Sequence, residues 1–220
     1  MQRASHTPVR LYLASTSPAR LATLRAAGVE PVLISPGVDE QAVVDAEEAR
    51  RGSSLGAEEF VQLLAKAKAE AVAGDPSIDG LVLGGDSAFA IAGRIHGKPH
   101  RPEVAKQRWL EQRGASGVLH SGHWLIDHRG GRHGDGVGAV AAAGVSFADD
   151  ITEDEIDAYI ATGEPLHVAG AFTIDSLGAA FITAVDGDPH AVVGLSVATL
   201  RGLVRELGVD WTDLWNIPKR

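Results

Sequence analysis

The segment "LASTSPAR" (residues 13–20) places three hydroxyl side chains, a proline and an arginine after an apolar run. Ser17 is a good N-cap and the proline a good first helical residue, so we expect a strand over 9–14 and a helix over 18–27. Free N–H groups and the helix dipole attract anions at such a junction. Arg20 can lean back over it. The segment is either a phosphate cradle or a plain capped helix with a surface arginine.

Two other segments supply carboxylates where strands are expected to end. "GGDS" (84–87) follows a buried run, and a carboxylate at Asp86 is costly there unless it is solvated, paired or bound to a metal. "VDEQ" (38–41) follows a strand expected over 31–35 and supplies Glu40. Carboxylate oxygens suit Mg²⁺ or Mn²⁺, so both acids are candidate metal ligands, and Asp86 is also a candidate general base. The alternatives are an aspartate that caps a turn and an ordinary loop acid.

A lysine is expected on the inward side of a helix over 56–73. Phe60, Leu64 and Lys68 follow the spacing i, i+4, i+8, so Lys68 lies along the apolar stripe, while Lys66 points elsewhere. A lysine in that position either extends its ammonium group to solvent or reaches into a cleft. Lys68 is therefore a candidate for binding an anionic ligand.

"GRIHGKP" (93–99) contains a second candidate cation, Lys98, next to a rigid proline. The segment is not a phosphate-binding P-loop. The spacing between Gly93 and Gly97 is one residue short, and Pro99 stands where Ser or Thr must bind Mg²⁺. We expect these residues in a hairpin.

The composition limits the classes of function. The chain has 220 residues, 45% of them hydrophobic, which is enough for a buried core in one domain. The net charge of −9 argues against a nucleic-acid polymer as partner. No apolar run is long enough to span a membrane, and the first ten residues, "MQRASHTPVR", lack an apolar signal core. Cysteine is absent, which excludes disulfides and thiol chemistry. We expect a cytoplasmic protein.

Strands and helices alternate in the first half, and hairpins dominate the middle. This pattern predicts a mixed α/β fold, with helices around a sheet, in a single domain over residues 1–220. The further elements that we expect are a loop with a short turn of helix over 36–55, a strand over 80–86, a hairpin over 89–99 turning at Gly93-Arg94, a helix over 102–113, strands over 117–128 and 137–148, a helix over 153–161, a loop over 163–178, a strand over 179–185 and a helix over 196–207.

The order of the segments is more specific than any one of them. "LASTSPAR", "VDE", "AKAKA", "GGDS", "GKP", "GEPLHVAGAF" and "VVGLS" occur in that order and resemble the Maf family of house-cleaning nucleoside triphosphate pyrophosphatases over about residues 10–207. The resemblance implies an α/β fold like that of the inosine triphosphate pyrophosphatases, with an elongated central sheet flanked by helices and two lobes with a cleft. It also implies a divalent cation, Mg²⁺ or Mn²⁺, and a homodimer.

The resemblance further assigns roles to residues. The matching positions are Ser15, Ser17 and Arg20 of a Ser-x-Ser-Pro-Arg-Arg phosphate loop, the essential acids Glu40 and Asp86, with Asp86 as proton acceptor, and the lysines Lys68 and Lys98. Ala19 departs from the family pattern, which usually has an arginine there. One contact to the triphosphate is thus lost or supplied elsewhere.

The segment after "GEPL" differs from that of the dTTP/UTP-type members, which reads Asp-Lys-Ala-Gly-Ala-Tyr-Gly-Ile-Gln-Gly. Residues 167–176 read His-Val-Ala-Gly-Ala-Phe-Thr-Ile-Asp-Ser. The branch that acts on 7-methyl-GTP also has His at the first position and an acid near the glutamine position, so the chain is similar to that branch. A carboxylate only accepts hydrogen bonds, which suits the N1–H and N2–H₂ edge of guanine, so Asp175 is a candidate base-binding residue. The alternative is that Asp175 binds nearby backbone.

The expected function is metal-dependent hydrolysis of nucleoside triphosphates between the α and β phosphates, giving a monophosphate and pyrophosphate. The metal ligands would be Glu40 and Asp86, and the substrate class leans to guanine nucleotides such as 7-methyl-GTP. Three alternatives stay open. They are a dTTP/UTP-type pyrophosphatase, a non-catalytic nucleotide-binding regulator of septum formation, and a metallohydrolase that uses some of the nine histidines.

Overall fold

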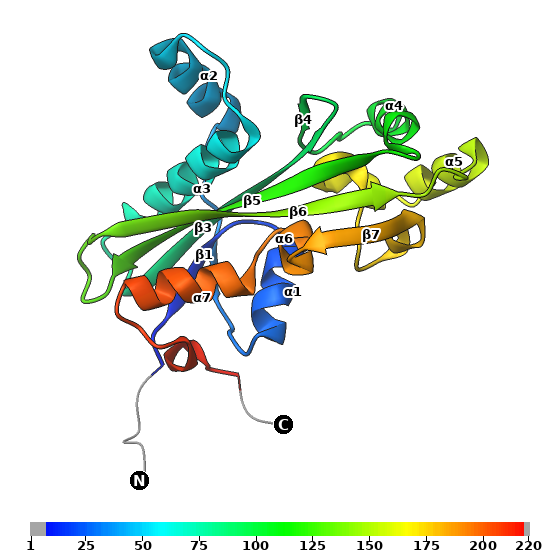
Figure 1. Ribbon diagram of the computed structural model, residues 1–220. Coiled ribbons are helices and arrows are strands. Elements are labelled where there is room, and N and C mark those ends of the chain that lie inside the picture. The colour runs from blue at the N-terminus through cyan, green and yellow to red at the C-terminus, as the bar shows by residue number, and fades with distance from the viewer. Residues whose placement is uncertain (1–7, 218–220) are drawn as a thin grey trace. The chain divides into compact units, whose positions relative to one another are not determined.

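A computed structural model describes residues 8–217, and Figure 1 traces their path. Most of the polar N-terminal stretch, residues 1–7, lies outside the described residues. The fold is mixed α/β, with a central open sheet flanked by helices, as the sequence predicts. None of the helices described is both long and apolar enough to cross a membrane.

The sheet combines parallel and antiparallel pairs. Its order is β2-β1-β3-β5-β6-β7, with β4 paired to β3. β1 is parallel to both β2 and β3, whereas β4 is antiparallel to β3 and β7 to β6. The strands are β1 (Leu11–Ala14), β2 (Val32–Ile34), β3 (Gly80–Ile91), β4 (Arg94–His96), β5 (Ser116–His128), β6 (Gly136–Phe147) and β7 (Ile182–Gly187).

Helices fill most of the remaining chain. The α-helices are α1 (Pro18–Ala26), α2 (Glu40–Arg51), α3 (Ala57–Ala73), α4 (Pro102–Gln112), α5 (Glu153–Ala161), α6 (Pro189–Val193) and α7 (Val197–Glu206). The 3₁₀ helices are η1 (Glu164–His167), η2 (Ala169–Ala171), η3 (Leu177–Phe181) and η4 (Trp211–Leu214).

These elements form two compact units. The first contains residues 8–86, together with Gly122–Val140 and residues 195–217. The second contains Ser87–Ser121 and Ala141–Gly194. The chain passes between the units within β3, β5 and β6 and again between Gly194 and Leu195, and each unit has a hydrophobic core of its own.

In the first unit the sheet has a separate core on each face, as the two-residue period of a strand requires. Along β1, Leu11 and Leu13 are buried with leucines of α1 and α7, whereas Tyr12 and Ala14 are buried with residues of α3. Figure 1 shows the same division, with α3 over one face of these strands and α1 and α7 over the other. Because β1 is packed on both faces, the loop that follows it starts from a fixed point.

The core of the second unit is aromatic. The rings of Phe89, Trp109, Phe147, Phe172 and Phe181 pack edge to face, with neighbouring centroids 5.0–5.8 Å apart. This is the arrangement that aromatic quadrupoles favour. The cluster joins β3, α4 and β6 to Phe172, which follows η2, and to Phe181, the last residue of η3.

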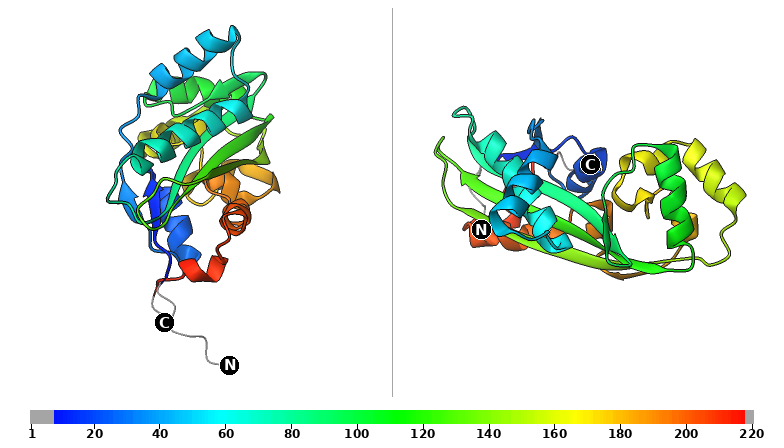
Figure 2. Two further views of the ribbon diagram at one scale, coloured as in Figure 1. Left: turned by 90° about the vertical axis from the view of Figure 1, so that its left-hand side faces the viewer. Right: turned by 90° about the horizontal axis from the view of Figure 1, so that it is seen from above.

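The loop predicted over 36–55 is wrong, because most of it is helix α2. The side chain of Asp39 caps the helix by accepting a hydrogen bond from the Ala42 backbone N–H at 3.1 Å, and Gly52 ends it with a left-handed φ of 73°. Val44 packs with Leu64 of α3, and the views in Figure 2 show α2 lying against α3. Tertiary contacts thus stabilise a helix whose own apolar pattern is weak.

The break predicted between a strand over 80–86 and a hairpin over 89–99 is also wrong. β3 runs unbroken from Gly80 to Ile91 because its second half pairs with β4, Phe89 opposite His96. The turn is Ala92-Gly93, one residue earlier than predicted. The strand predicted over 179–185 begins later, at Ile182, because η3 takes up the residues before it, and the short helix α6 is an element that the sequence did not indicate.

The C-terminal segment packs onto the first unit. Leu214 is fully buried among the leucines of β1 and α7. Asn216 hydrogen-bonds both the N–H and the C=O of Glu30, at 2.6 and 2.9 Å. The Val9 N–H donates to the Asp213 carbonyl at 2.8 Å. The tail therefore closes the end of the unit at which β1 begins and α1 ends.

Candidate functional site

The junction of β1 and α1 forms as the sequence predicts. Ser17 is the N-cap of α1, and its side chain accepts a hydrogen bond from the Arg20 backbone N–H at 3.4 Å. The Ser15 hydroxyl accepts from the Ser17 N–H and from Nη1 of Arg20, both at 3.1 Å. The loop is therefore a small, internally bonded structure that presents the start of a helix.

Arg20 is buried, with 8% of its surface exposed, so the alternative of a surface arginine is wrong. Its guanidinium lies over the backbone of Gly85, where a Cβ would meet Nε at 3.2 Å. Burial lowers the pKa of Arg20, and the charges of Asp86 and Glu40 oppose that effect. A guanidinium stays protonated at any physiological pH, so a full positive charge is fixed here.

Lys68 reaches the same region because α3 packs very closely on β3. A Cβ on Gly84 would overlap the Ala65 carbonyl and would lie 2.7 Å from the Ala69 nitrogen, so only glycine permits this approach. Lys68 lies on the buried stripe of α3, as the spacing predicts. It does not extend to solvent, because its Nζ lies 2.6 Å from Asp86 and 2.7 Å from Glu40.

Asp86 lies within β3 rather than at its end, and it is 8% exposed. Burial raises the pKa of its carboxyl, against the opposing charges of Lys68 and Arg20. The cost of burying this carboxylate, anticipated from the sequence, is offset by the ion pair with Lys68. A carboxylate with a raised pKa is a better proton acceptor than an ordinary aspartate.

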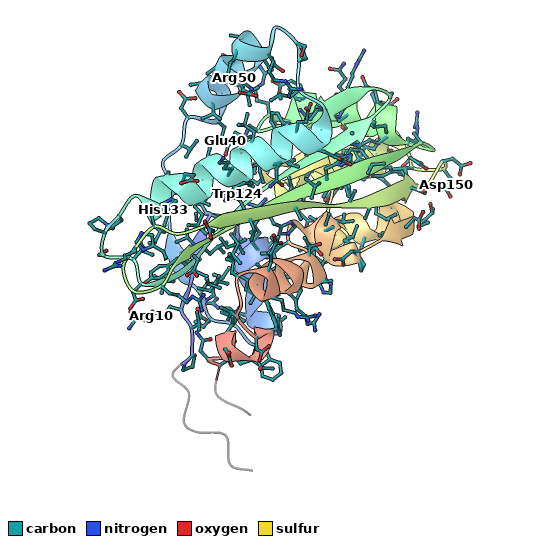
Figure 3. All side chains as sticks on the ribbon, turned by 60° about the vertical axis from the view of Figure 1, so that its left-hand side comes forward. Arg10, Glu40, Arg50, Trp124, His133 and Asp150 are labelled. Atoms are coloured by element: carbon teal, nitrogen blue, oxygen red, sulfur yellow. The ribbon has the colours of Figure 1, made fainter. Side chains whose placement is uncertain are left out.

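Glu40 is the first residue of α2, and Figure 3 labels it beside α3. Its side chain is 53% exposed, yet it places Oε1 2.7 Å from Lys68 Nζ. The cap at Asp39 fixes where α2 begins, and thereby fixes where Glu40 projects. One acid of the pair is thus buried and the other faces solvent.

The first unit therefore brings two carboxylates and two cationic groups together. Glu40 and Asp86 each place an oxygen within 2.7 Å of one ammonium nitrogen, so their oxygens converge on a single positive charge. Hard carboxylate oxygens are the ligands that Mg²⁺ and Mn²⁺ take, with phosphate or water completing the shell, so the donor set fits such a cation. Among residues 8–217 no three acids, histidines or cysteines form a complete metal cluster.

The other two predicted site residues belong to the second unit. Lys98 is exposed in the segment after β4, where Nη1 of Arg108 donates to the Gly97 carbonyl at 2.6 Å. Asp175 is exposed between η2 and η3. The assignment of Lys98 to phosphate binding and of Asp175 to base binding stays a prediction.

Glu164, the glutamate of "GEPL", is a polar centre that the sequence does not predict. Its carboxylate accepts a hydrogen bond from the side chain of Tyr159 in α5, and others from side chains and backbone of the segment 173–178. One signal in the sequence is the glycine that precedes it. Gly163 follows the end of α5 and has a left-handed φ of 79°. A glutamate at that position begins a new turn and can face back toward the chain that follows.

Comparison with known proteins places the chain in one family. The nucleoside triphosphate pyrophosphatase of Leifsonia xyli subsp. xyli is 66% identical, over 94% of this chain and 97% of its own length. Those of Salinispora tropica and Streptomyces coelicolor are 48% and 47% identical, over 95% and 94% of this chain and 88% and 94% of theirs. A family model described as Maf-like protein matches residues 10–207. The chain, with its acids and cations gathered around Lys68, therefore belongs to the family of Maf-like proteins.

Proposed function

We propose that the protein is a metal-dependent nucleoside triphosphate pyrophosphatase that hydrolyses the bond between the α and β phosphates. The observation that carries the proposal is the convergence of Glu40 and Asp86 on Lys68 Nζ, beside the buried Arg20. Relatives up to 66% identical bear the name nucleoside triphosphate pyrophosphatase, which supports the same activity here.

The cationic groups neutralise the triphosphate. Arg20, Lys68 and the N-terminus of α1 bind its oxygens. A triphosphate carries several negative charges on a short tail, and its transfer chemistry depends chiefly on positioning and electrostatics. The family's second arginine is replaced by Ala19 in this chain, so Arg20 must neutralise more of the triphosphate charge.

Asp86 orients the attacking water and accepts its proton. The water oxygen forms a bond to the α-phosphorus while the bridge between the α and β phosphates breaks, and pyrophosphate leaves with the bond's electrons. The raised pKa of Asp86 suits a proton acceptor. Glu40 and Asp86 are the residues that would hold Mg²⁺ or Mn²⁺, and such an ion, when bound, neutralises phosphate charge.

The base preference leans to guanine nucleotides such as 7-methyl-GTP. Asp175 can only accept hydrogen bonds, so it suits the N1–H and N2–H₂ groups of guanine. No group among the described residues hydrogen-bonds its carboxylate, which argues against the alternative that Asp175 serves the nearby backbone.

The test is pyrophosphate release from single nucleotides with Mn²⁺ or Mg²⁺, using 7-methyl-GTP, GTP, dTTP and UTP. Asp86→Asn should lower turnover by at least about a hundredfold while the melting temperature stays within a few degrees. Asp127→Asn is the matched control, because Asp127 lies in the same unit but pairs with Arg129, and its turnover should equal that of the wild type. Nucleotide binding without pyrophosphate release would instead favour the regulator.

A further inference from the structure

The carboxylate of Glu164 accepts five hydrogen bonds, more than any other acid among the described residues. Its Oε1 accepts from Tyr159 Oη (2.8 Å), Thr173 Oγ1 (2.5 Å) and the Gly178 N–H (3.1 Å), and its Oε2 accepts from Ser176 Oγ (2.7 Å) and the Leu177 N–H (3.3 Å). Four of the five donors belong to the segment 173–178, and the fifth belongs to α5.

These hydrogen bonds keep the Glu164 carboxylate ionised and use its lone pairs. Burial acts to raise the pKa of its carboxyl, but the hydrogen bonds from Thr173, Ser176, Tyr159 and the Gly178 backbone outweigh it and lower the pKa to about 2. A carboxylate has about four lone-pair sites, so five donors leave it no acceptor for a ligand. Glu164 is therefore unsuited to touch a substrate itself.

The hydrogen bonds to Glu164 come from residues on both sides of Asp175 in the sequence. Thr173 and Ser176, on either side of it, are both tied to Glu164, whereas the Asp175 carboxylate is exposed. Just before this segment, Trp109 Nε1 donates to the Ala171 carbonyl at 2.8 Å. The segment is thus fixed before and after Asp175, and the carboxylate between these points is left available.

The packing around Gly178 shows how tightly the segment is closed. A Cβ on Gly178 would lie 2.6 Å from Tyr159 Oη and 2.7 Å from the Thr173 carbonyl oxygen, so only glycine allows the Glu164 bonds and the turn to coexist. The conformation that presents Asp175 depends on these few contacts in an otherwise irregular stretch of chain.

We propose that Glu164 is a positioning residue for base selection, which holds the Asp175 segment in the conformation that reads the guanine edge. The inference rests on the proposed function, because it takes Asp175 as the residue that meets the base. Glu164 contributes through geometry alone. A shift of about 1 Å in the Asp175 carboxylate weakens its bonds to N1–H and N2–H₂ while leaving the phosphate chemistry unchanged.

The experiment compares kcat/KM for 7-methyl-GTP with kcat/KM for 7-methyl-ITP, which lacks only the N2 amino group. Asp175→Asn should lower this ratio by about tenfold, because it removes an acceptor. Glu164→Gln should lower the ratio by about threefold or more with kcat for 7-methyl-GTP little changed, because the amide presents donors to donors. The double variant should match Asp175→Asn alone, since both act on one contact.

A matched pair of variants distinguishes positioning of Asp175 from general structural support of the segment. Ser176→Ala and Tyr159→Phe each remove one hydroxyl that donates to Glu164, but only Ser176 adjoins Asp175. Ser176→Ala should lower the ratio, and Tyr159→Phe should leave it unchanged. This pair also carries the test if Glu164→Gln fails to fold, which melting curves will show.

The remaining outcomes contradict either base reading by Asp175 or positioning by Glu164. If Asp175→Asn leaves the ratio unchanged, base reading by Asp175 is wrong, and that part of the proposed function fails whatever Glu164 does. If Asp175→Asn lowers the ratio but Glu164→Gln and Ser176→Ala only lower stability or kcat for both nucleotides, Glu164 is a structural residue and this inference fails. Equal effects of Ser176→Ala and Tyr159→Phe on the ratio contradict it as well.

Discussion

Lys68 Nζ lies 2.6 Å from Asp86 Oδ1, and the two side chains are only 9% and 12% exposed. A buried ion pair adds little net stability, since desolvation of both charges opposes their attraction. Its value here is that the pair, with Glu40 as a third member, fixes three charged groups from β3, α2 and α3 at one point. Removing Lys68 is costly, because the charge of Asp86 then stays buried without its ammonium partner.

Lys68→Met should lower the free energy of unfolding by about 3 kcal/mol at neutral pH, because Asp86 is left without its partner. Lys66→Met is the matched control. Lys66 lies in the same helix but is exposed, with its Nζ 4.8 Å from the centroid of the Trp124 ring, so its loss should cost less than about 1 kcal/mol. Urea unfolding with a chelator present measures both. Equal losses in the two variants would contradict the buried pair.

The loss in Lys68→Met should depend on pH. Burial already raises the pKa of Asp86 against the charges of Lys68 and Arg20, and removal of Lys68 raises it further. A carboxyl whose pKa is higher in the folded state than in the unfolded state destabilises the fold as pH rises through its folded value. The difference in unfolding free energy between the variant and the wild type should therefore be larger at pH 8 than at pH 5. A difference independent of pH would exclude Asp86 as its cause.

Arg20→Met should raise KM for a nucleoside triphosphate by at least about tenfold, because a charge-assisted contact to phosphate is worth about 1.4 kcal/mol or more. Arg25 in the same helix supplies the control. It is exposed and pairs with Glu30 at 2.7 Å, so Arg25→Met should leave KM unchanged. Steady-state pyrophosphate release gives both values, and an unchanged KM in Arg20→Met would remove Arg20 from the phosphate site.

Gly84→Ala should destabilise the first unit by about 2 kcal/mol, because the added methyl group overlaps the backbone of α3. Gly202, in the middle of α7, faces open space, and Gly202→Ala should stabilise by about 0.5–1 kcal/mol through helix propensity. The two substitutions should therefore shift the midpoint of urea unfolding in opposite directions. If Gly84→Ala is neutral, α3 and β3 are not in the close contact that brings Lys68 to Asp86.

Glu164 should contribute stability that acid removes. Its pKa is lowered from 4.5 to about 2 in the folded state, so its contribution is present above pH 4.5 and is lost as the pH falls toward 2. The urea midpoint of the wild type should exceed that of Glu164→Gln at pH 6, and the gap should narrow at pH 3. A gap that stays constant between these pH values would show that the Glu164 charge does not stabilise the segment.

The sequence predicts those features that local spacing determines. The inward position of Lys68 follows from the helical period, and the start of α1 follows from Ser17 and the proline after it. The helix α2 could not be predicted, because Val44 becomes a core residue only when α3 lies beside it. The length of β3 likewise depends on pairing with β4, which is a tertiary contact.

The contacts within the candidate site show the same limit. Glu40, Lys68 and Asp86 were each identified as candidates by residue type and position, yet nothing in their spacing says that one ammonium nitrogen touches both acids. That contact requires Gly84 to admit the helix backbone. The contacts of Glu164 could not be predicted, because its donors are spread over residues 159–178 and no short motif contains them.

The first unit is assembled from three separate stretches of the chain, and Leu214 near its end is buried against β1 near its beginning. During synthesis β1 and α1 are made long before α7 and η4. Until then the leucines of β1 have no cover from α7 or η4. The core of this unit therefore cannot be completed before the residues up to Leu214 have been synthesised.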